Sequence, residues 1–257
     1  MRSLTAESSH NPLEKTVDSA IEPDVRLVEY DPDGELKVLT AILFEHSHME
    51  WTAALKAVGK MSNAKKHDLL ARYMADRPAR WYKVGRALEN SYLRFEILVD
   101  IGSYRDLHRH RMMTQERQLF STHHGYDVPP ELSESRLDST YTEALENVAT
   151  LFNKLESFDP NLAQYVVPLA YRIRFYQWQN FRQFFWETEL RTISQGHPTY
   201  RKVEQEKYRL VRARFPLLSR YLLVDLNDYG IARRGTEEKI SNKENRILSG
   251  LQDREGD

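Results

Sequence analysis

The sequence predicts an α+β fold: a helix-rich domain with a small antiparallel sheet and a long central helix. Apolar and polar residues alternate over 93–99, which is typical of a strand with one buried face, and 25–30 is a second short strand-like run. Most other apolar residues recur at helical spacing. The stretch 162–193 has no glycine and one proline near its beginning, so we expect a long helix there, interrupted or kinked early.

Length and composition favour one domain with tails. The chain has 257 residues, 40% of them hydrophobic, which is enough for a substantial core. We expect the domain at 25–232, a flexible polar segment at 1–24 and a charged tail at 233–257. No apolar run reaches the length of a membrane span and the first residues lack a secretory signal, so we expect a soluble cytoplasmic protein. A net charge of -1 disfavours nucleic acid or an anionic membrane as a general partner.

Further elements follow from the spacing of apolar residues. The first strand should end at the turn Asp31-Pro32-Asp33-Gly34, and one broken helix or two short helices should follow over 36–58. Another helix is expected around 69–73, ending by Pro78, and a further one from about Tyr141 to the break at Phe158-Asp159-Pro160.

The chain has no cysteine, which excludes disulfides, thiolate metal sites and cysteine nucleophiles. His46 and His48 are two positions apart and would point to different faces of a helix. We therefore expect no metal site.

A basic cluster centres on Arg109-His110-Arg111. Six cationic or potentially cationic side chains lie within thirteen residues: Arg105, His108, Arg109, His110, Arg111 and Arg117. Ser103 is a candidate N-cap, so a helix from about Tyr104 would carry the tripeptide in its second and third turns. The cluster fits either a solvated helix face with ion pairs or a site for a phosphate or dinucleotide.

Polar residues fall on both sides of the predicted long helix. At helical spacing, one face carries aromatic residues with Arg182 among them, and the opposite face carries Asn180, Glu187 and Arg191. Arg182 could be stacked on Trp178 and reach water, but polar groups on both faces indicate a helix that borders a site.

These segments together resemble the flavin-dependent thymidylate synthase family over about 88–208. The matching features are the Arg-His-Arg tripeptide, the strand before it, and Val167-Pro168-Leu169, Arg174, Asn180, Arg182 and Arg191. The version here is similar to the divergent branch of that family that often occurs as two fused copies.

The resemblance implies the fold of that family and an enzyme that uses FAD. It would transfer a methylene from methylenetetrahydrofolate to dUMP, with reduced flavin as electron donor and NADPH as its reductant, and would act as a homotetramer. By position, the FAD contacts would be Arg109, His110, Arg111, Asn180 and Arg182. Arg109 would also lie near the nucleotide, and Arg191 would be the catalytic residue that activates the uracil ring. The family uses no enzyme cysteine, in agreement with the composition.

The departures from the family pattern all fall on the nucleotide side. Leu119 stands where the family has a serine, Ser121 and Gln164 where it has arginines, Arg117 where it has a glutamate unless Glu116 serves, and Asn90 where a histidine is common. A phosphate that loses a guanidinium partner binds about a hundredfold more weakly, unless Arg117, His123 or His124 substitutes. Three hypotheses therefore stay open: an active thymidylate synthase, a flavoprotein acting on another uracil-like or pterin substrate, and a catalytically silent scaffold subunit.

Overall fold

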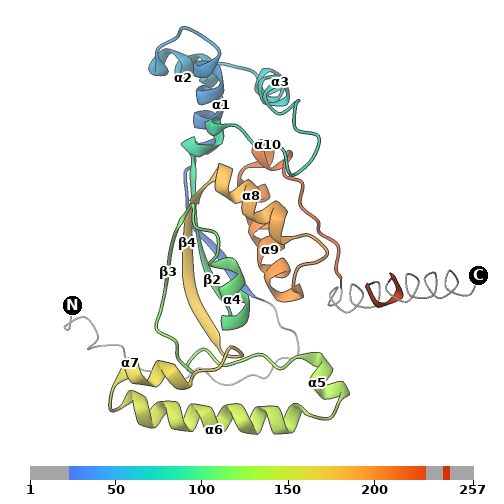
Figure 1. Ribbon diagram of the computed structural model, residues 1–257. Helices are drawn as coiled ribbons and strands as arrows, with labels where there is room; N and C mark the ends of the chain where they lie inside the picture. The colour runs from blue at the N-terminus through green and yellow to red at the C-terminus, as the bar shows by residue number, and fades with distance from the viewer. Residues whose placement is uncertain (1–22, 230–239, 244–257) are drawn as a thin grey trace, which may run out of the picture.

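The computed structural model describes residues 23–229 and 240–243, which form a small sheet covered on one face by helices (Figure 1). The sheet has four antiparallel strands in the order β1-β2-β4-β3. Their bounds are Asp24–Tyr30 for β1, Tyr92–Asp100 for β2, Thr114–Arg117 for β3 and Arg172–Asn180 for β4. The predicted α+β class and the first two strands are confirmed.

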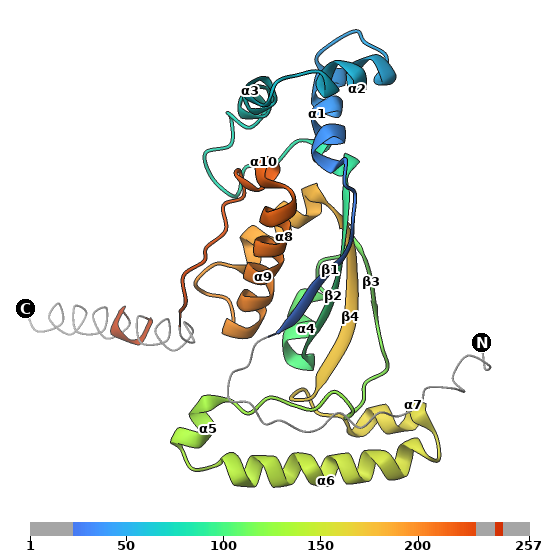
Figure 2. The ribbon, with the colours of Figure 1, turned by 180° about the vertical axis from the view of Figure 1, so that it is seen from behind.

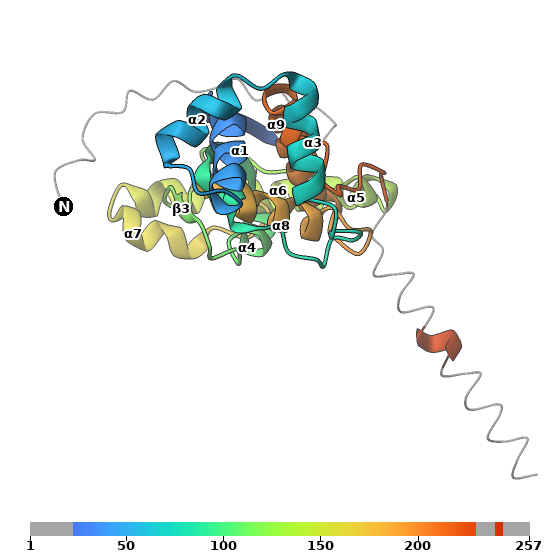
Figure 3. The same ribbon diagram turned by 90° about the horizontal axis from the view of Figure 1, so that it is seen from above.

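Helices occupy three regions around this sheet. At one end are α1 (Gly34–Glu45), α2 (Trp51–Gly59) and α3 (Asn63–Tyr73), which cover the nearer end when the molecule is viewed from above (Figure 3). Over one face lie α4 (Ile101–Leu107), α8 (Phe181–Arg191), α9 (Pro198–Arg214) and the short α10 (Pro216–Ser219). At the other end are α5 (Pro130–Glu134), α6 (Asp138–Glu156) and α7 (Pro160–Ala163). Of the two predicted alternatives over 36–58, one broken helix or two short helices, the structure has the two short helices. The predicted helix before Pro78 and the helix from about Tyr141 are confirmed.

The core lies between the sheet and the helices on its covered face. The inward residues of β2 include Phe95 and Ile97, both fully buried, and they pair in register with Gln177 and Phe175 of β4. Phe95 stacks on Phe184 of α8, with ring centroids 5.7 Å apart. Seen from behind (Figure 2), α4, α8 and α9 all lie on this side of the sheet. The packing fixes α8 and α9 directly against the inward side chains of β4.

The predicted long helix over 162–193 is wrong. The segment contains α7, a short 3₁₀ turn at Gln164–Val166, then β4 and α8. Ile173, Phe175, Gln177 and Gln179 are buried on one face of β4, so the period is two. Two of those four positions are glutamines, and polar residues at buried positions hid the alternation from a search for apolar periodicity. Tyr171, Phe175 and Trp178 therefore do not share a helix face with Arg182.

The predicted helix through Arg109-His110-Arg111 is also wrong. Helix α4 begins at Ile101, and Asp100 is its N-cap, accepting from the Ser103 backbone N–H at 2.7 Å. The helix ends at Leu107, so the tripeptide lies in the loop between α4 and β3. A loop lets His110 turn inward while both of its neighbours stay exposed.

The predicted flexible segment at 1–24 and charged tail at 233–257 lie almost wholly outside the described residues, so the domain bounds 25–232 stay a prediction. No helix in the described part of the chain is long and apolar enough to cross a membrane.

Candidate functional site

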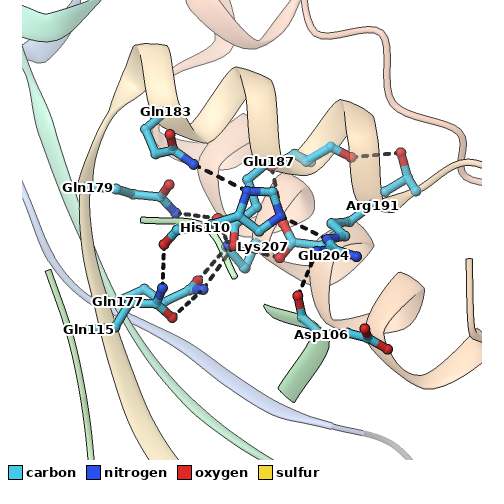
Figure 4. A network of polar contacts seen from close by, with 12 residues as sticks. Asp106, His110, Gln115, Gln177, Gln179, Gln183, Glu187, Arg191, Glu204 and Lys207 are labelled. Atoms are coloured by element: carbon cyan, nitrogen blue, oxygen red, sulfur yellow. Dashed lines mark hydrogen bonds and ion pairs between the residues drawn. The ribbon is translucent and has the colours of Figure 1, made fainter. Parts of the chain in front are cut away.

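The centre of the site is His110, whose ring is buried although both of its neighbours are exposed. Its backbone N–H donates to the Leu107 carbonyl at 3.2 Å, a turn that closes α4. From α8, Arg191 donates through Nε to His110 Nε2 at 2.8 Å and through Nη2 to the Asp106 carbonyl at 2.6 Å (Figure 4). The last residue of α8 is thus joined to both the end of α4 and the loop.

This contact defines the protonation state of His110. A guanidinium only donates, so His110 Nε2 must present its lone pair. Burial lowers the pKa of His110, the nearby Glu187 opposes this, and Arg191 and Lys207 lower it further. The ring is therefore neutral, with its proton on Nδ1. The side-chain amide of Gln183 lies 3.4 Å from Nδ1 and must turn its oxygen, not its nitrogen, toward this proton to accept it.

A buried polar cluster lies behind His110. Lys207 of α9 donates to Glu187 of α8 at 2.6 Å and to Glu204 at 3.0 Å, and none of the three side chains is exposed. Burial opposes ionisation of Glu187, but the charge of Lys207 and the hydrogen bonds from Lys207 and Gln179 outweigh it and lower the pKa of Glu187. Burial and then the charge of Glu187 raise the pKa of Glu204 to about 8. At neutral pH the cluster holds one carboxylate, one ammonium and one protonated acid.

Asn180 and Arg182, the predicted cofactor residues at the start of α8, form hydrogen bonds within the chain. Asn180 is the N-cap of α8, and its side-chain oxygen accepts from the Gln183 backbone N–H at 2.9 Å. Arg182 donates to Glu89 at 2.8 Å and to the Val84 carbonyl at 3.1 Å. It is not the cation over Trp178, because that place belongs to Arg94, 5.3 Å from the ring centroid.

Arg109 and Arg111 present their guanidinium groups to solvent. Arg109 is 64% exposed in its side chain and forms one long contact, 3.3 Å, with Asp106. Arg111 is exposed, and no ion pair joins it to any residue within 23–229 or 240–243. Neither cation is neutralised by a tight partner there, so both can receive an anionic ligand.

On the predicted nucleotide side, a pocket of about 570 Å³ lies between β3 and α7. It is lined by Arg117, Phe120, Asp159, Asn161, Leu162, Gln164 and Tyr165. The Arg117 guanidinium stacks over the Phe120 ring at 3.9 Å, and Gln164 Oε1 accepts from the Phe120 backbone N–H at 3.0 Å and faces Arg117 at 3.5 Å.

Of the three side chains expected to replace a missing phosphate partner, Arg117 is the one that lines this pocket. His123 contacts Glu156 at 2.9 Å, and His124 contacts Gln118 at 2.9 Å. Burial lowers the pKa of His124, and nearby Arg174 lowers it further, which makes it a poor cation. The structure thus brings together Arg117 with Gln164, and His110 with Arg191, as two separate parts of the site.

Comparison with known proteins identifies the family. The sequence pattern of the thymidylate synthase complementing protein family matches residues 26–217. The chain belongs to this family. It is 39% identical over 216 residues to a UPF0159 protein of Chlamydia pneumoniae, covering 84% of this chain and 41% of that protein. It is also 34% identical to a UPF0159 protein of Chlamydia muridarum, covering 86% and 42% respectively. The chain thus spans about two fifths of the length of these relatives.

Solved structures share the architecture of this chain. A UMP/dUMP methylase, PolB from Streptomyces cacaoi, was solved with 5-Br dUMP and with 5-Br UMP. The first superposes with a TM-score of 0.63 at 15% identity, over 78% of this chain and 94% of that one. At this identity the likeness shows the fold.

For this member of the thymidylate synthase complementing protein family, the sequence did not predict the buried cluster behind His110. Its members come from α8 and α9, and the glutamines that contact them, Gln177 and Gln179, come from β4, so no local pattern links these residues (Figure 4). One signal was available: Glu204 and Lys207 are three positions apart on one helix, a spacing that places side chains together. Within 23–229 and 240–243, no group of three or more His, Asp or Glu is arranged to hold a metal ion.

Proposed function

We propose that this chain is a flavin-dependent thymidylate synthase. It would use FAD and NADPH to transfer a methylene from methylenetetrahydrofolate to C5 of dUMP. The methylene carbon becomes the methyl group of dTMP by taking up a hydride equivalent that derives from NADPH, and tetrahydrofolate is released. The observation that carries this proposal is the Arg191–His110 contact, which joins the proposed activating arginine to the proposed flavin loop.

The arrangement of Arg191 suits activation of a uracil ring. Nε and Nη2 are held by His110 and the Asp106 carbonyl, while Nη1 donates to no acceptor in the described part of the chain. A guanidinium fixed in this way presents a donor that cannot lose its proton and stabilises negative charge developing on N3 and the adjacent carbonyl oxygen of the base. Because His110 is neutral, it does not repel the guanidinium.

The residues present fit an anionic flavin cofactor. The exposed guanidinium groups of Arg109 and Arg111, without tight partners among the described residues, match a diphosphate. Asn180 and Arg182, at the first turn of α8, would complete the FAD contacts together with His110. Bound FAD supplies the electrons that reduce the transferred carbon. These five residues bind and orient it.

Arg117 would hold the nucleotide phosphate in place of the family's arginines. It lines the pocket between β3 and α7, and Gln164, which stands at the position of one missing arginine, contacts it. In this chain the guanidinium would therefore come from Arg117 on the β3 side of the pocket, and not from the position of Gln164 on the opposite side. A ribonucleotide is a second candidate substrate, because PolB of the same fold is a UMP/dUMP methylase.

Purified protein tests the proposal in two steps. First, absorbance of bound flavin, before or after addition of FAD, is expected; protein that stays colourless would leave the scaffold hypothesis standing. Second, with NADPH and methylenetetrahydrofolate, dUMP is expected to give dTMP, and UMP serves as the parallel substrate. If only UMP is methylated, the substrate is the ribonucleotide and not dUMP. If the protein binds flavin but methylates neither nucleotide, the substrate is another uracil-like compound or a pterin. Light scattering should give the mass of a homotetramer. If this chain alone forms no dTMP, the same assay is repeated with its natural partner or fused copy present.

A further inference from the structure

The loop that carries His110 is connected to the protein interior by a continuous row of side-chain hydrogen bonds (Figure 4). The row starts at Lys207, whose ammonium has no exposed surface. Its donors reach Glu187 at 2.6 Å, Glu204 at 3.0 Å and Gln177 Oε1 at 2.7 Å. All three hydrogens of the ammonium are therefore used.

Lys207 determines the direction of the amide groups that follow. An ammonium cannot accept, so Gln177 must turn its oxygen toward Lys207 and its nitrogen away. That nitrogen donates to Glu187 at 2.9 Å and to Gln115 Oε1 at 3.3 Å. With its oxygen engaged, Gln115 donates through Nε2 to the His110 carbonyl at 2.6 Å. Neither glutamine can reverse without losing a partner on both sides.

We infer that Lys207 is a positioning residue for the segment 108–115, which is the loop after α4 and the first two residues of β3: its buried ammonium orients Gln177 and Gln115, and through them holds the backbone carbonyl of His110. Arg191 holds the ring of the same residue from the other side. The residue is thus fixed at two points, by Arg191 of α8 and by Gln115 of β3, which Gln177 of β4 and Lys207 of α9 orient. The effect on flavin binding rests on the function proposed above, while the effect on the loop does not.

Among the groups around Lys207, the carboxylate of Glu187 holds the ammonium in place. Glu187 and Arg191 face the cluster from α8, Glu204 lies beside it on α9, and His110 faces it from the loop. Glu187 stays ionised, and Glu204 keeps a proton because burial and Glu187 raise its pKa. The buried ammonium of Lys207 is therefore neutralised by the carboxylate of Glu187, in an interior where an unpaired charge is strongly disfavoured.

Local hydrogen exchange of the full-length protein without added flavin tests this inference. Lys207→Met keeps the length of the side chain and removes its donors, so amide exchange in a peptide covering 108–115 should rise roughly threefold or more. Arg77→Met is the matched control, because Arg77 is likewise buried and paired with a buried carboxylate, Glu189. It should lower the melting temperature without a comparable increase in exchange of this loop. Equal exchange of the loop in wild type and Lys207→Met, or an equal increase in both variants, would overturn the inference.

If Lys207→Met does not fold, variants of Gln115 test whether the row of hydrogen bonds positions the segment 108–115. Gln115 is partly exposed, so its replacement should be tolerated. In Gln115→Glu the first oxygen still accepts from Gln177, but the second faces the His110 carbonyl and repels it until it is protonated. Loop exchange, corrected for the intrinsic effect of pH, should rise roughly three- to tenfold at pH 7 and return toward the wild-type value near pH ~4. A loop that exchanges like wild type at both pH values would show that the row of hydrogen bonds does not position it.

Flavin titration separates this inference from the proposed function. Gln115→Glu should weaken FAD binding at pH 7 by roughly the same three- to tenfold factor. Faster loop exchange with unchanged FAD affinity would keep the positioning role and contradict the assignment of the loop to flavin. A protein that binds no FAD in any form would contradict the proposed function and leave the exchange result to stand on its own.

Discussion

Arg191 and His110, 81 positions apart in the chain, share a hydrogen bond of 2.8 Å from the guanidinium Nε to the imidazole Nε2. The contact needs a neutral histidine, and burial of His110 lowers its pKa in the required direction. It also leaves Nη1 of Arg191 without an acceptor among the described residues. The guanidinium is thus held through Nε and Nη2, and Nη1 remains as the donor not used by these contacts.

Replacement of Arg191 by alanine should therefore remove methylation and leave FAD bound. Loss of a preorganised donor to a developing negative charge lowers turnover by about a hundredfold or more. The loop that carries His110 should keep its conformation, because the Gln115 hydrogen bond to the His110 carbonyl does not involve Arg191. The measurements are dTMP formation and flavin absorbance of the purified variant.

Arg209→Ala is the control for this variant. Arg209 is exposed on α9 and pairs with Glu206, away from His110, so its loss should change neither property. If Arg191→Ala loses FAD as readily as it loses methylation, Arg191 supports the cofactor rather than the reaction.

Much of the fold followed from periodicity where one face of an element is wholly apolar. Strand β2 alternates Leu93, Phe95, Ile97 and Val99 on its buried face, and both its type and its end were predicted. Strand β4 places Gln177 and Gln179 on the same kind of face, and it was predicted as a helix. The difference is physical: buried polar residues are permitted when tertiary partners satisfy them, and those partners are not visible in local sequence.

The candidate site could be predicted only in part for the same reason. The resemblance pointed to His110 and Arg191 separately, but their contact depends on α4 ending at Leu107 so that the loop can turn inward. Apart from its spacing from Glu204, Lys207 carried no signal of function, because a lysine on a polar helix is usually solvated. Its burial depends on four elements meeting.

Asn180 allows a structural role to be separated from a cofactor role. Its side-chain oxygen caps α8, so Asn180→Ala should lower the free energy of unfolding by about 1 kcal/mol, measured by urea denaturation. Asn180→Asp keeps an oxygen at the cap and should recover that stability. If Asn180 also binds FAD through its amide, both variants should bind FAD more weakly by flavin fluorescence. Full recovery of FAD affinity in Asn180→Asp would limit the residue to capping.

Arg117 is expected to bind the phosphate of the substrate. Arg117→Ala should weaken dUMP binding by about ten- to a hundredfold, because one charge-assisted contact to a dianion is lost. Binding of deoxyuridine, which has no phosphate, should be unchanged, as calorimetry on the flavin-loaded protein would measure.

A second substitution tests whether an arginine at position 164 can take over the role proposed for Arg117. Gln164→Arg restores the residue usual in the family, and Gln164 contacts Arg117 in this chain. Added to Arg117→Ala, it should recover most of the affinity for dUMP. Equal weakening of dUMP and deoxyuridine by Arg117→Ala, without rescue, would mean that the pocket does not bind the phosphate.

The buried acid Glu204 should give the stability of the protein a specific dependence on pH. Its pKa is raised to about 8 in the folded protein, against 4.5 for the ordinary value. The folded state therefore holds this proton more tightly than the unfolded state, and the stabilisation is complete below pH 4.5 and is lost as pH rises toward 8. Glu187 acts in the opposite sense, because its pKa is lowered. The contribution of Glu204 must therefore be isolated by comparison with a variant.

Glu204→Gln provides that comparison, because an amide resembles the protonated acid and does not titrate. Its oxygen can accept from Lys207 and its nitrogen can donate to Thr188, which lies 3.3 Å from the carboxyl group. The variant should match wild type near pH 4.5 and become progressively more stable than wild type as pH rises to 8, by at least about 1 kcal/mol. Glu206→Gln, an exposed carboxylate on the same helix, should follow the wild-type profile. A constant difference between Glu204→Gln and wild type across this range, in denaturation experiments at fixed ionic strength, would show that Glu204 is already ionised in the folded protein.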